Sequence, residues 1–113
     1  MARFLIIEPH ADIRRLYAAV IRGMGHEPIL FDGVSTGVPD VILVEPADPE
    51  SFEVARQFHH DYPDAPIVCA SIYERSLLET RALQPVTDLL KPFVLVELTE
   101  ALELALSRRR RLS

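Results

Sequence analysis

Each of four short apolar runs in this sequence is followed directly by a polar side chain that can do chemistry: Glu8, Glu45, Ser71 and Lys91. Carboxylate, hydroxyl and ammonium groups form charge-assisted hydrogen bonds, so Lys91 is expected to pair with Glu45. Ser71 is expected to hydrogen-bond the same carboxylate. The four residues form one candidate site if the fold brings the ends of the runs together.

Imidazole and carboxylate groups near the first run suggest a second hypothesis, a transition-metal site. His10 and Asp12 lie within four residues of Glu8, and Glu45 could join them. Their spacing matches no ligand signature, and Asp12 is better placed as the N-cap of a following helix. No metal site is predicted, although Glu8 and Glu45 are the residues that could bind a metal weakly.

The sequence carries no signature of a common catalytic or nucleotide-binding site. It has no glycine-rich phosphate loop, no zinc-type spacing of Cys and His, and no glycine elbow around Ser71. The one cysteine, Cys69, lies in an apolar run and is expected to be a buried, inert thiol. We therefore expect a protein that is not an enzyme.

The elements that must position the site alternate between strand and helix. Five apolar runs are continuous, which is typical of parallel strands covered on both faces: residues 4–7, 28–31, 41–44, 67–70 and 86–90. Apolar residues at helical spacing predict helices at residues 13–24, 52–58, 76–83 and 93–109. Gly25 is expected to end the first of these helices.

This alternation predicts βαβ units with right-handed crossovers in an open, doubly wound α/β sheet. One connection is unusually short. Residues 32–40 include two glycines and a proline, and a crossover with its helix needs at least about 10–12 residues, so the second crossover helix is predicted to be missing or vestigial. The functional site of such a sheet lies at the carboxyl ends of its strands, where the four polar residues stand.

Several segments together resemble the response-regulator receiver domain, and they lie at residues 4–15, 41–49, 66–71 and 89–93. The last segment is the most specific, because it resembles the family's lysine–proline pair, and the Lys91–Pro92 bond is expected to be cis. The resemblance covers nearly the whole chain. It implies a single domain over residues 1–113 with a flavodoxin-like (CheY-like), five-stranded parallel sheet in the order 2-1-3-4-5.

The site departs from what the resemblance would require for phosphoryl transfer. Receivers hold Mg²⁺ with a pair of acids after the first strand, but here Pro9 stands beside Glu8 in place of the second acid. Receivers accept phosphate on an aspartate after the third strand, whereas Glu45 has an extra methylene that displaces its carboxylate. Mg²⁺ demands near-octahedral oxygen geometry, so its binding is expected to be weak or absent, and no cofactor is predicted. Asp88 stands where the family has the aromatic residue of its switch.

These departures predict a degenerate receiver, that is, a phosphorylation-independent signalling and protein-interaction module. Glu45 carries one negative charge where a phosphoryl group carries about −1.5 to −2, so it is at best a crude mimic of an active state. The other interpretation is that Glu45, Glu8 and Lys91 form only an ion pair that stabilises the strand ends. The alternative is a receiver that is still phosphorylated in a two-component phosphorelay at a non-standard carboxylate, Asp48 or Glu45. A metal or small-molecule sensor that uses the same pocket is a third reading.

A protein partner is expected to bind beside the last helix. At 100° per residue, the core-facing stripe of that helix consists of Val94, Leu95, Leu98, Ala101, Leu102, Ala105 and Leu106. Val96 and Leu104 fall outside the stripe, and the resemblance places Leu77 and Leu78 near them on a surface that receivers use for dimerisation or docking. A homodimer through the last helix is therefore one expected form of association. The other candidate surface is the sheet face that a missing second helix would uncover, around Ile29, Phe31 and Ile42.

Charge and hydropathy limit the other partners. The net charge is −5, but arginines 108–111 supply four of the twelve basic residues, which leaves eight basic and seventeen acidic side chains in residues 1–107. A body this acidic repels phosphate backbones, so no nucleic acid is expected to bind the domain itself, and residues 108–113 are interpreted as a basic tail. No apolar stretch is long enough for a membrane span or a signal peptide, and a cytoplasmic location is expected.

Overall fold

The structure is a computed structural model that describes residues 1–31, 37–71, 81, 83–91 and 94–112. Five parallel strands form one sheet, and they are β1 Arg3–Ile7, β2 Glu27–Leu30, β3 Val41–Val44, β4 Ile67–Ser71 and β5 Thr87–Leu90. Three helices lie in the described part of the chain, and they are α1 Ala11–Gly23, α2 Pro49–Asp61 and α4 Leu95–Leu112. The strand order β2-β1-β3-β4-β5 confirms the predicted topology.

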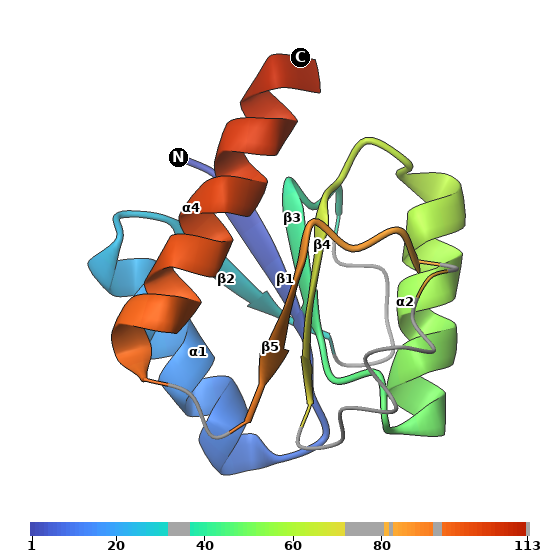
Figure 1. Cartoon of the computed structure of the whole chain (residues 1–113), viewed down its shortest axis with the longest axis horizontal. Coiled ribbons are helices and arrows are strands. Elements are labelled where there is room, and N and C mark those ends of the chain that lie inside the picture. The colour runs from blue at the N-terminus through green and yellow to red at the C-terminus, as the bar shows by residue number, and fades with distance from the viewer. Residues whose placement is uncertain (32–36, 72–80, 82, 92–93, 113) are drawn as a thin grey trace.

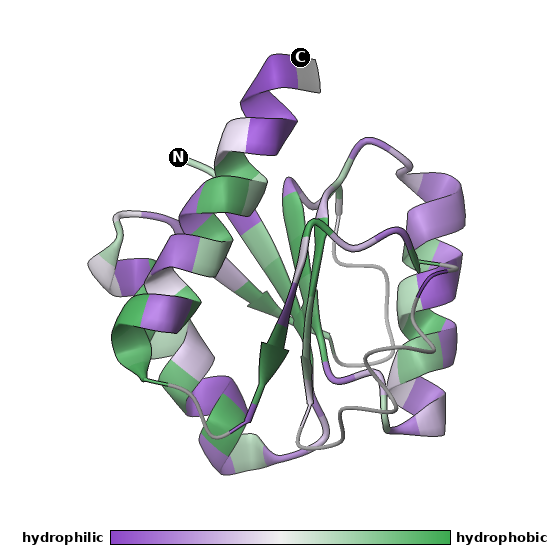
Figure 2. Ribbon diagram, in the orientation of Figure 1, coloured by the Kyte–Doolittle hydropathy of each residue, from purple (hydrophilic) through white to green (hydrophobic). Residues whose placement is uncertain are grey.

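Helices cover both faces of the sheet, and this explains why the apolar runs are continuous (Figure 1). In β1, Phe4 and Ile6 belong to the apolar layer shared with α1 and α4. Leu5 and Ile7 belong to the opposite layer, which includes residues of α2. The three central strands, β1, β3 and β4, are accordingly mostly hydrophobic, whereas the helices carry many hydrophilic residues (Figure 2).

The ends of α1 differ in part from the prediction. The helix begins at Ala11 with His10 as its N-cap, so the prediction that Asp12 caps the helix is wrong. Asp12 instead lies in the first turn, where its Oδ1 accepts a hydrogen bond of 2.8 Å from the Arg15 guanidinium. Gly25 follows the helix with φ +85°, a conformation that glycine adopts without strain, and this confirms its role as the stop.

The connection from β2 to β3 contains no helix in its described residues, 37–40, which agrees with the short crossover. The face beside β2 is nevertheless covered. Phe31 packs edge-on against Phe58 of α2 with a centroid distance of 5.9 Å, and Ile29 and Ile42 are buried in the same layer. The prediction that this face is less covered is therefore wrong for Ile29 and Ile42, which are buried, whereas Phe31 is half-buried against α2.

The register of α4 is confirmed over most of its length. Five residues of the predicted stripe are buried, and they are Leu98, Ala101, Leu102, Ala105 and Leu106. Val96 and Leu104 are exposed, as predicted. Val94 and Leu95 are also exposed, so the prediction that they face the core is wrong: Val94 precedes the helix, and amphipathic spacing gives the direction of a face but not how far the sheet extends beneath it.

Several predictions concern residues outside the described part of the chain. The helix at 76–83 lies mostly there, as do Leu77, Leu78 and the Lys91–Pro92 bond, which includes residue 92. Among the described helices, none is both long and apolar enough to cross a membrane.

Candidate functional site: a buried carboxylate–lysine cluster

Three charged side chains meet at the carboxyl ends of the central and edge strands. Glu8 directly follows β1, Glu45 directly follows β3, and Lys91 directly follows β5. Parallel pairing places Ile7 beside Val44, so the two carboxylates leave the sheet side by side. Lys91 is held in place by its own backbone, because its N–H donates a 2.7 Å hydrogen bond to the carbonyl of Ser71 at the end of β4.

The Lys91 ammonium bridges the two carboxylates. Its Nζ lies 2.6 Å from Glu8 Oε1 and 2.9 Å from Glu45 Oε2. The side chains of Lys91, Glu8 and Glu45 are only 9%, 1% and 8% exposed. The predicted pair between Lys91 and Glu45 is thus present, and Glu8, which the structural interpretation of the sequence grouped with them, is the second partner of the ammonium.

The two remaining carboxylate oxygens also have donors within the chain. Glu8 Oε2 accepts a 3.2 Å hydrogen bond from the backbone N–H of His10 and lies 3.1 Å from the His10 ring Nδ1. Glu45 Oε1 accepts a 2.9 Å hydrogen bond from the backbone N–H of Ala47. Every oxygen of both carboxylates is therefore bound by a neighbouring group.

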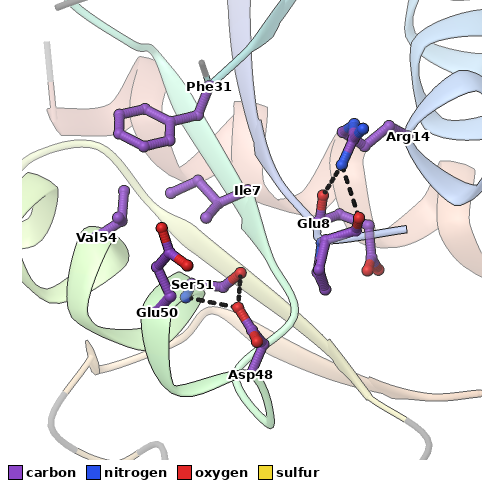
Figure 3. Close-up of a pocket in the computed structure, with 9 residues that line it drawn as sticks. Ile7, Glu8, Arg14, Phe31, Asp48, Glu50, Ser51 and Val54 are labelled. Carbon is purple, nitrogen blue, oxygen red and sulfur yellow. Dashed lines mark hydrogen bonds between the residues drawn. The ribbon is translucent and has the colours of Figure 1, made fainter. Parts of the chain in front are cut away.

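The two carboxylates and the ammonium carry a formal net charge of −1 in a site that is almost closed to solvent. Two further side chains, Arg14 and Tyr17, lie close to this charge. Arg14 brings a second cation to the edge of the cluster, where its guanidinium donates to the carbonyls of Glu8 at 2.7 Å and Pro9 at 2.9 Å (Figure 3). Tyr17 lies beneath the cluster in the core. Burial raises the pKa of the Tyr17 phenol, and the negative charges of Glu8 and Glu45 raise it further.

The other predicted residues lie around the cluster in different roles. Ser71 is fully buried at the end of β4. Pro9 lines an adjoining cavity of about 290 Å³ together with Arg14, Phe31 and Asp48. Asp48 acts as the N-cap of α2, since its Oδ2 accepts hydrogen bonds from the Ser51 backbone N–H at 2.9 Å and the Ser51 hydroxyl at 2.7 Å (Figure 3).

The hypothesis of a transition-metal site finds no support in the described residues, which contain no group of three His, Cys, Asp or Glu side chains arranged to hold an ion. Asp12 is turned to Arg15 rather than to Glu8. Within the cluster itself, the ammonium of Lys91 lies between the two carboxylates that a cation would have to bridge.

The architecture closely matches solved structures. The chain has the CheY-like receiver fold. A response regulator receiver domain protein from Methanospirillum hungatei JF-1 matches with a TM-score of 0.86, over 100% of this chain and 99% of that chain, at 14% sequence identity. The response regulator TrrA from Thermotoga maritima, in complex with Mg²⁺-BeF, matches with a TM-score of 0.76 over 91% of this chain and 97% of that chain, at 21% identity.

NtrX from Brucella abortus, in complex with ADP, matches with a TM-score of 0.84 over 96% of this chain but only 27% of that chain, at 20% identity. The receiver fold thus occurs there as one part of a longer protein. No family model matches the sequence, and no curated protein matches it.

Two polar contacts of the cluster, made by His10 and Arg14, are not predicted from the sequence. The sequence suggests His10 only as a metal ligand, but a histidine two residues after a buried glutamate can also bind that glutamate through both its backbone N–H and its ring. The contact of Arg14 is indicated in the sequence only by its position, one turn into the helix that follows Glu8. From this position a long side chain can reach back to the end of the strand.

Proposed function

We propose that this domain is a receiver-fold signalling module that works by binding protein and without being phosphorylated. The observation that carries the proposal is the Lys91 ammonium, which bridges Glu8 and Glu45 at hydrogen-bonding distance while the other two carboxylate oxygens are bound by His10 and Ala47. The charge balance that a bound divalent ion would supply is already provided, in large part, by a side chain.

The residues present fit Mg²⁺ poorly. Mg²⁺ needs several oxygen ligands in near-ideal octahedral geometry at about 2.0–2.1 Å, and it loses its water reluctantly. Here the side chain after Glu8 is Pro9, which has no oxygen to offer, and both carboxylates are nearly inaccessible. Binding Mg²⁺ would require Lys91 to leave a site in which its charge is needed, since removing one partner of a buried ion pair costs about 3–5 kcal/mol.

Glu45 is also a poor phosphoacceptor in this setting. Phosphoryl transfer depends almost wholly on positioning and on cations that neutralise the developing charge. Glu45 Oε2 is bound to Lys91 and Oε1 to the Ala47 N–H, so neither oxygen is directed to an incoming phosphodonor. The cluster therefore ties the ends of β1, β3 and β5 together, and we assign the signalling role to the surface of the module.

The surface that we assign to the partner lies on the last helix and the strand before it. Val96 and Leu104 are 59% and 44% exposed, and Leu90 of β5 together with Val94 and Leu95 adds further exposed apolar area. Hydrophobic residues crowd the first turn of α4 (Figure 2). Single exposed apolar residues are common, but Val94, Leu95 and Val96 follow one another at the start of α4, and Leu104 is exposed about two turns further along the helix. A group of exposed apolar residues on one element supports a contact surface.

The absence of phosphorylation is tested by weighing the intact protein after incubation with Mg²⁺ and acetyl phosphate. We expect no gain in mass. The matched variant carries Pro9→Asp and Glu45→Asp, which restores the acid pair and the shorter acceptor, and it is expected to gain one phosphoryl group on a fraction of molecules. A stoichiometric phosphoryl group on Glu45 or Asp48 of the unchanged protein would support the phosphorelay alternative instead.

The contact surface is tested by measuring the molar mass in solution as a function of concentration. We expect Val96→Asp with Leu104→Asp to abolish self-association while the melting temperature stays nearly unchanged, because exposed substitutions usually cost under about 0.5 kcal/mol. Leu16→Asp is the control, since Leu16 is as exposed as Leu104 but lies on α1. Association that survives the double variant, or is lost equally in the control, would place the contact elsewhere.

A further inference from the structure

The exposed charges of α4 are divided between the two halves of the helix. Its first half carries the acids Glu97, Glu100 and Glu103, and its last turns carry arginines 108–111. These last turns extend beyond the ends of the strands (Figure 1). Arg109 is directed back to the body of the domain, where its Nε lies 4.0 Å from Asp40 Oδ1, whereas Arg108 and Arg111 are exposed.

Four of these charged residues share one stripe of the helix with an exposed leucine at its centre. The stripe consists of Glu97, Glu100, Leu104, Arg108 and Arg111, and all five side chains are exposed. At about 100° per residue they lie within an arc of about 80°. Their spacing is symmetric, because Glu100 and Arg108 lie four residues before and after Leu104, and Glu97 and Arg111 lie seven residues before and after it.

A stripe of this kind is complementary to a copy of itself that runs in the opposite direction. In an antiparallel pair of helices centred on Leu104, residues equally far before and after the leucine lie at the same level. Glu100 of one copy then faces Arg108 of the other, and Glu97 faces Arg111. A two-fold axis repeats each of these pairs, so oppositely charged pairs flank a central contact between two leucines on both sides. A parallel pair would instead place like charges opposite each other.

The helix macrodipole explains only part of this pattern. Acids near the start of a helix and cations near its end are favourable in any helix. Glu97 also has a local role, since its Oε1 accepts a 3.2 Å hydrogen bond from the Val94 backbone N–H. Neither effect requires the acids and the arginines to share one exposed stripe, or to be spaced evenly around an exposed leucine.

We propose that α4 binds a second copy of this chain as an antiparallel helix pair centred on Leu104. The proposal rests on the proposed function, because it names the partner of the contact surface assigned to α4. Leu104 supplies the apolar centre, and the exposed Val96 adds apolar area beside the acidic half. Each copy contributes mainly one helix, so the dimer is expected to be weak and to depend on concentration.

The test is a charge reversal at one pair, followed by sedimentation equilibrium of the whole chain. Glu100→Arg alone, or Arg108→Glu alone, turns two attractive pairs of the dimer into two repulsive ones, and each should weaken the dimer by about tenfold. The two substitutions together restore opposite charges, so the combined variant should recover an affinity within about threefold of the unchanged chain. Both residues are exposed, so the melting temperatures should stay nearly unchanged.

Glu103→Arg is the matched control. It makes the same change of charge on the same helix, but it lies about 100° away from Leu104, outside the stripe, and it should change the affinity by less than about threefold. Raising sodium chloride from about 0.1 M to about 1 M shortens the Debye length from about 10 Å to about 3 Å and should weaken the dimer of the unchanged chain several-fold.

Three results would overturn the proposal. Dimers that persist in both single variants would place the contact elsewhere, and a combined variant that does not recover would exclude the antiparallel register. A chain that stays monomeric at every concentration would exclude a second copy as the partner. That last result would leave the proposed function intact, because a different protein could still bind the surface, whereas phosphorylation of the unchanged chain would overturn the proposed function without affecting the dimer.

Discussion

Replacing Lys91 by methionine tests whether the cluster is held together by charge. Methionine keeps most of the length of the side chain and its apolar contacts, so the main change is the loss of the ammonium. Glu8 and Glu45 would then face each other as uncompensated, nearly inaccessible carboxylates. Removing one partner of a buried ion pair costs about 3–5 kcal/mol, which is a large part of the roughly 5–15 kcal/mol that stabilises a domain.

The loss should be plain in thermal and urea unfolding followed by circular dichroism. For a chain of this size one kcal/mol corresponds to about 4 °C, so Lys91→Met is expected to lower the melting temperature by about 12–20 °C at pH 7. The difference from the unchanged protein should shrink as the pH is lowered, because protonation removes the uncompensated charge. Glu45→Gln, which leaves one carboxylate for one ammonium, is expected to stay within about 1 kcal/mol of the unchanged protein.

Arg15→Ala is the control for loss of a cation at the surface. Arg15 and its partner Asp12 are 76% and 93% exposed, so their ion pair should contribute under about 1 kcal/mol. The reasoning would be refuted if Lys91→Met were no more harmful than Arg15→Ala. A loss of stability that is the same at pH 7 and pH 4 would show that Lys91 acts through packing and not through charge.

Three further predictions concern single side chains. Asp48→Ala removes the N-cap of α2 and should cost about 0.5–2 kcal/mol in urea unfolding, whereas Asp48→Asn, which keeps the acceptor, should cost little; equal effects would deny the cap. Burial raises the pKa of Asp88 above its unfolded value, so this residue favours folding only at pH values low enough to protonate it, and that contribution is lost as the pH rises through the folded pKa. Because Asp88 is exposed, solvent screens this effect, and Asp88→Asn should raise the melting temperature only slightly at pH 7 and less at pH 3; an equal rise at both would contradict this. Burial raises the pKa of Tyr17 as well, so stability should fall above about pH 10, where the unfolded phenol ionises, and Tyr17→Phe should remove that part of the fall measured by urea unfolding; an unchanged pH dependence would contradict it.

The fold was open to prediction because parallel strands covered on both faces leave continuous apolar runs, and because the polar residues that follow them converge at one edge. That reasoning placed Lys91 beside Glu45. It also grouped Glu8 with this pair, but it could not give the bridging position of the ammonium, because the height of each side chain above the sheet depends on the register of β1, β3 and β5 and on the exit of the chain from each strand. The exposure of Val94 and Leu95 was not predicted for a related reason: the spacing of apolar residues along a helix does not show where the sheet beneath the helix ends.

Local competition between side chains accounts for the remaining differences. Asp12 has the right type for an N-cap, but the N-cap position is taken by His10, whose backbone and ring are both held by the carboxylate of Glu8, two residues earlier. The chain therefore enters α1 one residue before Ala11, and Asp12 is left in the first turn with Arg15. The position at which α1 begins thus depends on the contact between Glu8 and His10, which exists only in the folded protein.

The most direct test of the central claim is a titration of the domain with Mg²⁺, followed through the backbone amide signals of His10, Ala47 and Lys91. These amides report on the hydrogen bonds that hold the two carboxylates and on the strand end that positions the ammonium. If Lys91 already supplies the cation of this site, millimolar Mg²⁺ will leave the signals unchanged in the natural sequence and will shift them in the variant with Pro9→Asp and Glu45→Asp. Saturable shifts of these amides in the natural sequence would contradict the account.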